Sequence, residues 1–385
     1  MIYMDHNATT PLDKRILEKM LPYLKDIYSN PSSVYRFAQE SKKAVEDARS
    51  LVARLLCASP DEIVFNSGGT ESDNTAIKGI ALMHRKKGNH IITSKIEHHA
   101  VLHACEFLEK IGFEVTYLDV DEYGVIDIEQ LKASIKKETI LVSVMHANNE
   151  VGTIQPIKEI ADICKSHKVY FHTDAVQTVG KIKIDVGDLG VDLLSLSSHK
   201  FYGPKGVGAL YVKKGTKLFP LLHGGGHEMG RRSGTENVAG IVGLGEAARL
   251  AMGESEVESK RIAVLCDRLQ AGIISKIPES KVNGHSSARL ANTLNVCIRH
   301  IEGESILINL DFEGICASSG SACTSGSLEP SHVLLAMGIP AEVAHGSLRL
   351  SLGKQNTDKD VDKILEVLPP IVEKLRKISP FWQHA

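Results

Sequence analysis

The feature that most constrains the fold is a regular alternation of short apolar runs and helical patterns between about residues 50 and 215. The apolar runs are rich in β-branched residues, which are typical of strands. Strands that alternate with helices form a mostly parallel sheet covered on both faces. We therefore predict an α/β fold whose large domain holds a seven-stranded sheet, with strands at residues 62–65, 90–94, 114–118, 140–146, 169–173, 193–197 and 208–212.

The remainder of the chain predicts a smaller α+β unit. A glycine-rich segment, "LLHGGGHEMGRRSGTEN", follows the last of these strands and is too irregular for a helix. A long helix is expected from about residue 238 to 277, interrupted or bent near Gly253. The last helix is expected to start at the capping residue Thr357 and to be interrupted at Pro369 and Pro370. We predict a large domain over residues 12–255 and a small domain over residues 1–11 and 256–385.

Charge and composition narrow the kind of partner. The formal net charge is only -2, and charges of both signs are well mixed, which argues against a nucleic-acid partner. No apolar run approaches the ~20 residues of a membrane span, and residues 1–5 lack an export signal. The seven cysteines form no CxxC pair and are odd in number, which fits a reducing compartment. We expect a cytoplasmic chain that acts on a small molecule, without a membrane.

Polar side chains follow several predicted strands at the point where each ends. In such sheets, ligands bind beyond the carboxyl ends of the strands. These side chains are therefore expected to converge on one pocket. The segments are Asn66-Ser67-Gly68-Gly69-Thr70, Glu97-His98-His99, Ala147-Asn148-Asn149-Glu150, Asp174 and Ser198-His199-Lys200.

These strand ends can support the chemistry of pyridoxal phosphate (PLP). A buried lysine such as Lys200 has a lowered pKa and can form a Schiff base. PLP enzymes also place an acid on the pyridine nitrogen, for which Asp174 is suited, and Gln177 is close enough in sequence to reach the ring hydroxyl. The phosphate needs backbone donors at a helix start, which the Ser67–Thr70 turn provides. Ser197 and His199 can add further donors.

Other interpretations of the same residues stay open. A single Lys or Asp at a strand end is more often a surface residue, and a Ser-Gly-Gly-Thr turn is more often a tight helix entry. The chain lacks the GxxxxGK[ST] and GxGxxG patterns of nucleotide-binding loops. His99 and His103 would share a helix face near His98 and Cys105, which is compatible with a metal, although no further ligand is evident. An imidazole stacked on a cofactor ring explains His98 better.

Two residues of the smaller unit are further candidates. Cys323 lies in "ASSGSACTSGSLEPS", a hydrated Ser/Gly loop, where a thiol can be reactive or simply an inert surface group. Arg349 lies in "SLRLSL", where strand alternation places it on the polar face with the serines. If that face lines the cleft, its planar fork is suited to a substrate carboxylate. If the face is solvated, Arg349 has no such role.

At this point the chain resembles a known family, the PLP-dependent cysteine desulfurases of the NifS/IscS type within the class V aminotransferases. The likeness covers nearly the whole chain and implies the fold type I of PLP-dependent transferases. The motifs that carry it are "MDHNATTPLD", "NPSSVY", "NSGGTESDN", "EHHAV", "MHANNEVGTIQPI", "HTDAVQTVGK", "SLSSHKFYGPKGVGALYV", "GGGHEMGRRSGTEN", "SSGSACTSGSLEPSHVL" and "SLRLSLG".

The resemblance implies specific roles. Lys200 would be the Schiff-base lysine, with Cys323 and His98 as further catalytic residues. The other cofactor-binding residues would be Gly69, Thr70, Asn149, Asp174, Gln177, Ser197 and His199, with Thr235 reaching the phosphate of the other subunit in a homodimer. The substrate L-cysteine would be held by Asn149 and Arg349. Its sulfur would pass to Cys323 as a persulfide and then to a sulfur-acceptor protein such as an iron–sulfur scaffold.

Two departures from the family pattern are visible. His6 replaces the usual asparagine in "DNNATT", and Tyr35 replaces the usual histidine after "NPSS". Neither touches the predicted chemistry, and either could alter substrate entry. Selenocysteine lyase or another class V reaction is an alternative activity, and a non-catalytic scaffold is an alternative of another class. The sequence also leaves open whether Cys323 ligates an iron–sulfur cluster transiently and which protein accepts the sulfur.

Overall fold

A seven-stranded sheet forms the centre of the computed structural model, which describes residues 1–319, 329–380 and 382. β8 is antiparallel to its neighbours β2 and β7, and all the other neighbouring strands are parallel. The predicted α/β class with a mostly parallel sheet is confirmed. The strands, in spatial order, are β2 (Ile63–Asn66), β8 (Gly208–Val212), β7 (Leu193–Ser197), β6 (Tyr170–Asp174), β5 (Thr139–Ser143), β3 (His90–Ser94) and β4 (Glu114–Leu118).

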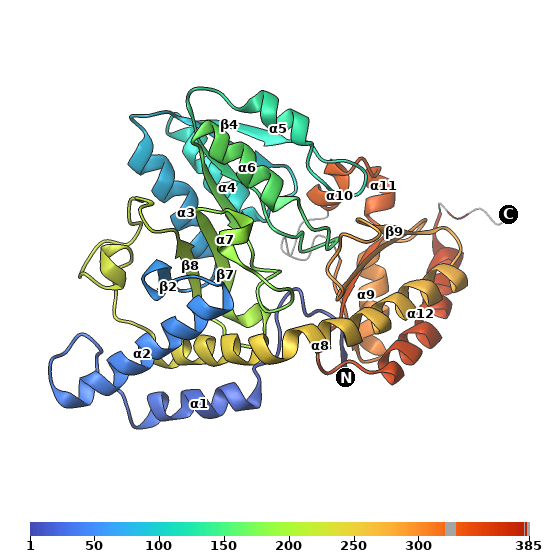
Figure 1. Cartoon of the computed structure of the whole chain (residues 1–385). Helices are drawn as coiled ribbons and strands as arrows, with labels where there is room; N and C mark the ends of the chain where they lie inside the picture. Colours follow the sequence, from blue (N-terminus) through green and yellow to red (C-terminus); the bar gives the residue numbers. More distant parts are fainter. Residues whose placement is uncertain (320–328, 381, 383–385) are drawn as a thin grey trace.

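Helices cover both faces of this sheet (Figure 1). One face packs against α1 (Lys14–Lys25), α2 (Arg36–Leu55), α6 (Ile157–His167) and the first half of α8 (Val238–Lys276). The other face packs against α3 (Gly69–His84) and α4 (His99–Lys110). Two short helices, α5 (Ile128–Ser134) and α7 (Val186–Leu189), and the 3-10 turns η1 (Pro60–Glu62), η2 (Ser198–Lys200) and η3 (Glu228–Gly230) complete this part. Among the described helices, none is long and apolar enough to cross a membrane.

A smaller antiparallel sheet has the order β12-β10-β9 and its own apolar core. Met4, from the start of the chain, packs in this core with residues between 262 and 375. The division at residues 11 and 255 stays a prediction. The elements are β9 (Ser280–Asn283), β10 (Thr293–Ile298), β12 (Ser347–Ser351), α9 (Gly303–Phe312), α10 (His332–Ala336), α11 (Ala341–Ala344) and α12 (Asp358–Ile378), with β1 (Ile2–Tyr3) paired to β11 (Ile315–Cys316).

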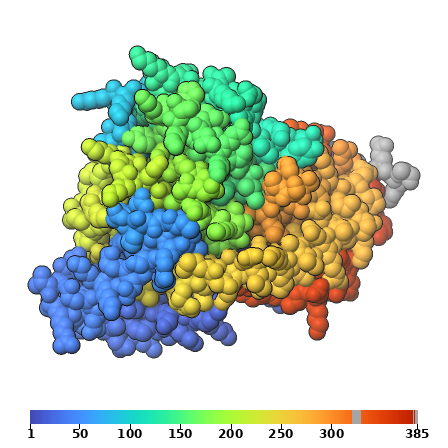
Figure 2. All heavy atoms as spheres, in the orientation of Figure 1, coloured from blue at the N-terminus to red at the C-terminus, as the bar shows by residue number. Residues whose placement is uncertain are grey.

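Two expected helix breaks are absent. α8 runs for 39 residues without interruption at Gly253 and contributes side chains to both apolar cores. Figure 2 shows the gold to orange atoms of its second half on this face of the molecule. α12 continues through Pro369 and Pro370, so the predicted interruption there was wrong. A proline cannot donate to the carbonyl four residues earlier. For Pro369 that carbonyl belongs to Leu365, and the ammonium of Lys276 in α8 donates to it at 3.0 Å instead.

The glycine-rich segment is tied to the large sheet by a buried ion pair. Arg49 of α2 donates to both carboxylate oxygens of Glu228, at 2.7 and 2.9 Å. The same carboxylate accepts the backbone N–H of Phe65 in β2 at 2.8 Å. The side chains of Arg49 and Glu228 are only 7% and 2% exposed. Removing one partner of such a pair leaves a buried charge without compensation.

Arg49→Met is therefore expected to lower the free energy of unfolding by about 3–5 kcal/mol. Lys260→Met is the matched control, because Lys260 pairs with Glu256 where the two side chains are 76% and 81% exposed. That substitution should cost less than about 1 kcal/mol. Denaturant unfolding of both variants measures the difference. Equal losses would show that the buried pair does not hold the segment.

Candidate active site

Lys200 lies at the end of β7, where the chain enters η2. Its ammonium donates to the main-chain oxygens of Asn7 at 2.6 Å and of Ala8 at 2.8 Å. The N-terminal segment is itself fixed to this turn, because the backbone N–H of Thr10 donates to the oxygen of His199 at 2.9 Å. The hydroxyl of Thr10 accepts the N–H of Tyr202 at 2.7 Å. The start of the chain thus sets the position of the lysine.

Asp174 ends the neighbouring strand β6 and is buried. One of its carboxylate oxygens accepts the N–H of Val176 at 2.8 Å. Burial raises the pKa of Asp174 to about 6, against the hydrogen bond from Val176 and the charge of Lys200, which both favour the ionised form. Asp73 of α3 is also buried, and burial together with the charge of Asp174 raises its pKa well above the usual range. The negative charge of Asp174 therefore disfavours ionisation of the neighbouring Asp73.

His98 is the N-cap of α4 and lies half-buried near Lys200. Its Nδ1 accepts the N–H of Ala100 at 3.1 Å, so the proton of the neutral ring sits on Nε2. Burial lowers the pKa of His98 to about 4, and the charge of Lys200 acts in the same direction. The ring is therefore an uncharged, flat surface above that pKa, as stacking on a cofactor requires.

The turn from β2 into α3 forms a cradle for an anion. Gly68 has φ +145°, and a Cβ on Gly69 would approach Val176 Cγ2 at 2.7 Å, so only glycine fits there. Ser197 lies beside both glycines. The first N–H groups of a helix such as α3 have no partner within the helix and favour negative charge. Thr70 lies exposed in this first turn.

His199 lies next to Lys200, and its Nδ1 is 3.0 Å from the Thr9 hydroxyl oxygen. Burial and then the charge of Lys200 lower the pKa of His199 to about 4. Gln177 reaches the same region, since its Nε2 donates to the oxygen of Asn7 at 2.9 Å. His98, Asp174 and His199, which come from three strand ends, therefore lie within reach of the charge of Lys200, and Gln177 shares the Asn7 oxygen with it.

Arg349 of β12 faces this region from the smaller sheet and is 2% exposed. It donates to the Asp5 carboxylate at 2.8 Å and to the main-chain oxygen of Asn149 at 3.1 Å. Its buried Nε has no hydrogen-bond partner within residues 1–319, 329–380 and 382. A buried donor that is left free is costly unless a ligand accepts it. The polar face predicted from the alternation in "SLRLSL" is therefore directed into the protein rather than into solvent.

For two of the predicted site residues, the structure describes no contact with the other residues of the site. Thr235 is exposed in the glycine-rich segment. Three residues earlier, Arg232 pairs with Glu71 of α3 at 2.9 Å, which brings the segment close to the anion cradle. Cys323 lies outside the described residues.

The residues present fit pyridoxal phosphate by their chemistry. The glycine turn at the start of α3 suits the phosphate, because Gly68 has a positive φ and a Cβ on Gly69 would clash with Val176. The buried Asp174 suits a ring nitrogen that carries a proton. The amine of Lys200 suits the aldehyde, and the uncharged His98 suits the face of the ring. A metal has less support: His99 lies 4.8 Å from His332 and 5.0 Å from His103 between ring centroids, but no such cluster within residues 1–319 and 329–380 is arranged to hold an ion.

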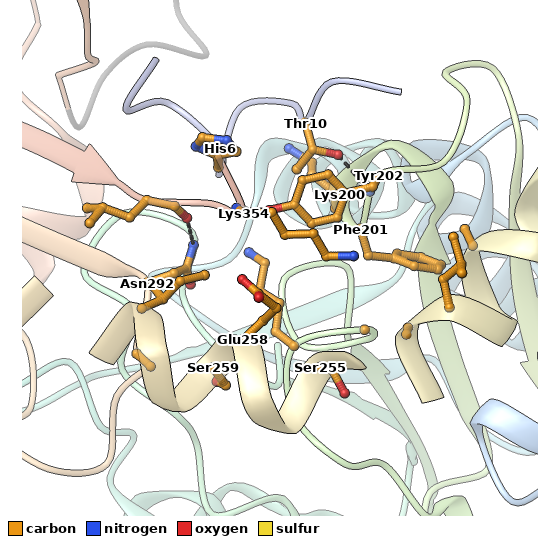
Figure 3. Close-up of a pocket in the computed structure, with 18 of the residues that line it drawn as sticks. His6, Thr10, Lys200, Phe201, Tyr202, Ser255, Glu258, Ser259, Asn292 and Lys354 are labelled. Carbon is orange, nitrogen blue, oxygen red and sulfur yellow. Dashed lines mark hydrogen bonds between the residues drawn. The ribbon is translucent and has the colours of Figure 1, made fainter. Parts of the chain in front are cut away.

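A pocket adjoins Lys200 on the side of α8 (Figure 3). Its wall includes His6, whose Nδ1 is 3.0 Å from the oxygen of Ser351 and whose pKa burial lowers. Tyr35 lies elsewhere, 55% exposed at the N-cap of α2. The other residues labelled in Figure 3 are Thr10, Phe201, Tyr202, Ser255, Glu258, Ser259, Asn292 and Lys354.

Several residues of the site have no signal in the sequence pattern. Asn7 and Asp5 precede the first predicted strand, and neither belongs to a periodic segment. Lys181 donates to the side-chain oxygens of Gln177 at 2.9 Å and Asn7 at 3.2 Å, and burial lowers its pKa to about 7. The only available signal was their place in "MDHNATT" and "HTDAVQTVGK", two of the segments that carry the family likeness.

Comparisons with known proteins show the family of the chain. The family model for aminotransferase class V matches residues 2–364. The cysteine desulfurase IscS of Methanosarcina thermophila is 59% identical over 379 residues, which cover 98% of this chain and 94% of that protein. A solved NifS-like protein superposes with a TM-score of 0.92 at 41% identity, covering 97% of this chain and all of that one (100%). SspA in complex with cysteine has a TM-score of 0.83 at 40% identity, with 91% and 99% covered.

The lowered pKa of His98 has a consequence for stability. In the unfolded chain the ring takes up a proton near its usual pKa of 6.5, whereas in the folded protein it does so only near 4. Protonation therefore favours unfolding as the pH falls between these values. Compared with His98→Asn, which keeps an N-cap acceptor, the wild-type protein should lose stability over this range. NMR titration of the ring checks the pKa directly, and titration near 6.5 would contradict the assignment.

Proposed function

Since the chain belongs to the class V aminotransferases and, within them, to the cysteine desulfurases of the NifS/IscS type, we propose that it removes sulfur from L-cysteine with pyridoxal phosphate. The products are L-alanine and a persulfide on Cys323. The observation that best supports this is the position of Lys200 near the buried Asp174 and the uncharged His98, at the end of the strand whose Ser197 lies beside the glycine turn. When bound, the cofactor supplies an aldehyde for amines and a ring that withdraws electrons from the substrate's α-carbon.

Four groups of the chain hold the cofactor in this proposal. The N–H groups at the start of α3, with Gly69 and Thr70, take the phosphate. Ser197 and His199 add donors from the end of β7. Asp174 holds a proton on the ring nitrogen, and Gln177 donates to the ring oxygen. The neutral ring of His98 covers one face and excludes water from it, while Asn149 borders the same space.

Lys200 has two tasks. Its amine would hold the aldehyde of the cofactor, and once the substrate is bound, the free amine would take the proton from the α-carbon of cysteine. The resulting ammonium has acceptors ready in the oxygens of Asn7 and Ala8. The same proton is therefore held close to the reacting carbon.

Arg349 and Asn149 orient the substrate. The Nε of Arg349, which has no partner among the described residues, is suited to the carboxylate of cysteine, while one N–H of each terminal nitrogen is engaged with Asn149 or Asp5. A substrate fixed at its carboxylate and amine presents its thiol in one direction, which aligns the reacting groups.

The thiolate of Cys323 attacks the sulfur of the bound cysteine. A sulfur–sulfur bond forms while the carbon–sulfur bond breaks, and the bonding electrons stay with carbon, which takes up protons to become alanine. Support comes from the loop "SSGSACTSGSLEPS", which resembles the long cysteine loop of the family. The terminal sulfur is then available to an acceptor protein such as an iron–sulfur scaffold.

We also propose a cytoplasmic homodimer with the two-part division predicted from the sequence. In the dimer, Thr235 reaches the phosphate of the other subunit. The exposure of Thr235 and the anchoring of its segment through Arg232 to Glu71 are compatible with this role.

Lys200→Ala is expected to abolish covalent retention of the cofactor and to lower alanine release by about 10²–10⁴-fold, since a general base is lost. Borohydride treatment followed by peptide mass spectrometry should find the cofactor fixed to the peptide with Lys200 in the wild-type protein only. Lys205→Ala is the control, because Lys205 is exposed in the following turn. Cofactor fixed to another lysine would refute the assignment.

Cys323→Ala is expected to keep the cofactor's absorption and its change on addition of cysteine, but to stop sulfide release. The reason is that substrate binding does not need the thiol, whereas sulfur transfer does. Cys57→Ala removes an exposed thiol and should leave sulfur release unchanged. Turnover of Cys323→Ala at the wild-type rate would show that another group accepts the sulfur.

A further inference from the structure

Asn7 is a buried residue whose side chain uses all of its hydrogen-bonding capacity. It is 1% exposed and lies in the N-terminal segment, between β1 and the turn at Thr10. Its amide bonds join parts of the chain that are far apart in sequence. Nδ2 donates to Thr293 Oγ1 at 2.8 Å and to the oxygen of Asn149 at 3.1 Å, and Oδ1 accepts from Asn292 Nδ2 at 2.9 Å and Lys181 Nζ at 3.2 Å.

The main chain of Asn7 is equally engaged. Its N–H donates to Ser351 Oγ at 2.9 Å, in the smaller sheet. Its carbonyl oxygen accepts from Lys200 at 2.6 Å and from Gln177 at 2.9 Å. The peptide unit that meets the Lys200 amine is thus fixed by the side chain of the same residue.

Two carbonyl oxygens on one amine favour its charged form. An ammonium has donors only, so each carbonyl oxygen stabilises it. The neighbouring charges act in both directions: Asp174 attracts the ammonium, while Lys181 repels it. His98 and His199 also face Lys200, and both are uncharged above about pH 4. The oxygens of Asn7 and Ala8 therefore contribute to holding a proton on Lys200.

We propose that Asn7 is a positioning residue for Lys200: its fully bonded side chain fixes the carbonyl oxygen that, with that of Ala8, holds the amine where it receives and returns the substrate proton. The proposal deepens the function given above and rests on it. Arg349 is linked to the same point, because it donates to the Asn149 oxygen that also accepts from Asn7. The residue therefore joins the proposed base to the proposed carboxylate site.

A merely structural role is the competing explanation, and Asn356 provides the matched control. Asn356 is also buried, at 3% exposure. Its Nδ2 donates to the oxygen of Tyr3 at 3.0 Å, so it too secures the N-terminal segment, but none of its recorded bonds among the described residues reaches Lys200. Asn356→Ala should therefore reproduce any loss of stability without the effect on the amine.

The experiment measures the amine itself in the full-length chain freed of cofactor. Competitive acetylation over a range of pH, read for the Lys200 peptide by mass spectrometry, gives its pKa. Asn7→Ala should lower the pKa of Lys200 by about one unit, the size expected when a hydrogen bond to a charged donor is lost. Asn7→Ser should shift it in the same direction and serves if the alanine variant does not fold. In the cofactor-loaded protein, both should lower kcat for alanine release by about 10–100-fold with a smaller change in KM.

An unchanged labelling profile in both Asn7 variants, or an equal shift in Asn356→Ala, would overturn the proposal. Because labelling needs neither cofactor nor turnover, it tests Asn7 independently. Failure of the wild-type protein to release alanine would instead refute the proposed function.

Discussion

The site depends on the geometry of the parallel sheet, which delivers the carboxyl ends of its strands to one edge. Asp174 and Lys200 follow adjacent strands β6 and β7, and the anion cradle follows β2, across the antiparallel β8. The backbone of β8 packs closely against the turn after β2. A Cβ on Gly208 would lie only 2.6 Å from the Cα of Gly68. The cradle and the lysine therefore share one rigid support, although more than a hundred residues separate them.

Burial changes the protonation of the ionisable side chains at this edge of the sheet. It raises the pKa of Asp174 to about 6 and lowers those of His98 to about 4 and Lys181 to about 7. The raised pKa of the acid and the lowered pKa values of the two bases all favour the uncharged forms, so fewer charges are held away from water. The cations that persist have dedicated acceptors, two carbonyl oxygens for Lys200 and a carboxylate for Arg349. A bound anionic cofactor and a zwitterionic substrate would thus enter a site whose fixed charges are few and already oriented.

The local alternation of apolar runs and helical patterns predicted the sheet well. The predicted bounds agree with the observed ones for the strands at 90–94, 114–118, 193–197 and 208–212. Asp174 and Lys200 were found by the same route, since each follows an apolar run. The sequence pattern could not predict single residues whose partners are far away in the sequence. In α12, the carbonyl that Pro369 leaves without a helical donor accepts a hydrogen bond from Lys276, 89 positions before Leu365. Asn7 likewise depends on partners at 149, 181 and 292. No window of sequence contains both members of such a pair.

These remote bonds also explain why the start of the chain belongs to the catalytic edge. Asp5 forms an isolated parallel bridge with Ser351, while its carboxylate holds Arg349. Two residues later, Asn7 meets Lys200. Arg349 on the small sheet and Lys200 on the large one are therefore linked through Asp5, Asn7 and Ala8, in a short stretch that folds as a turn. Besides α8, this short stretch therefore joins the two units directly, beside Lys200 and Arg349.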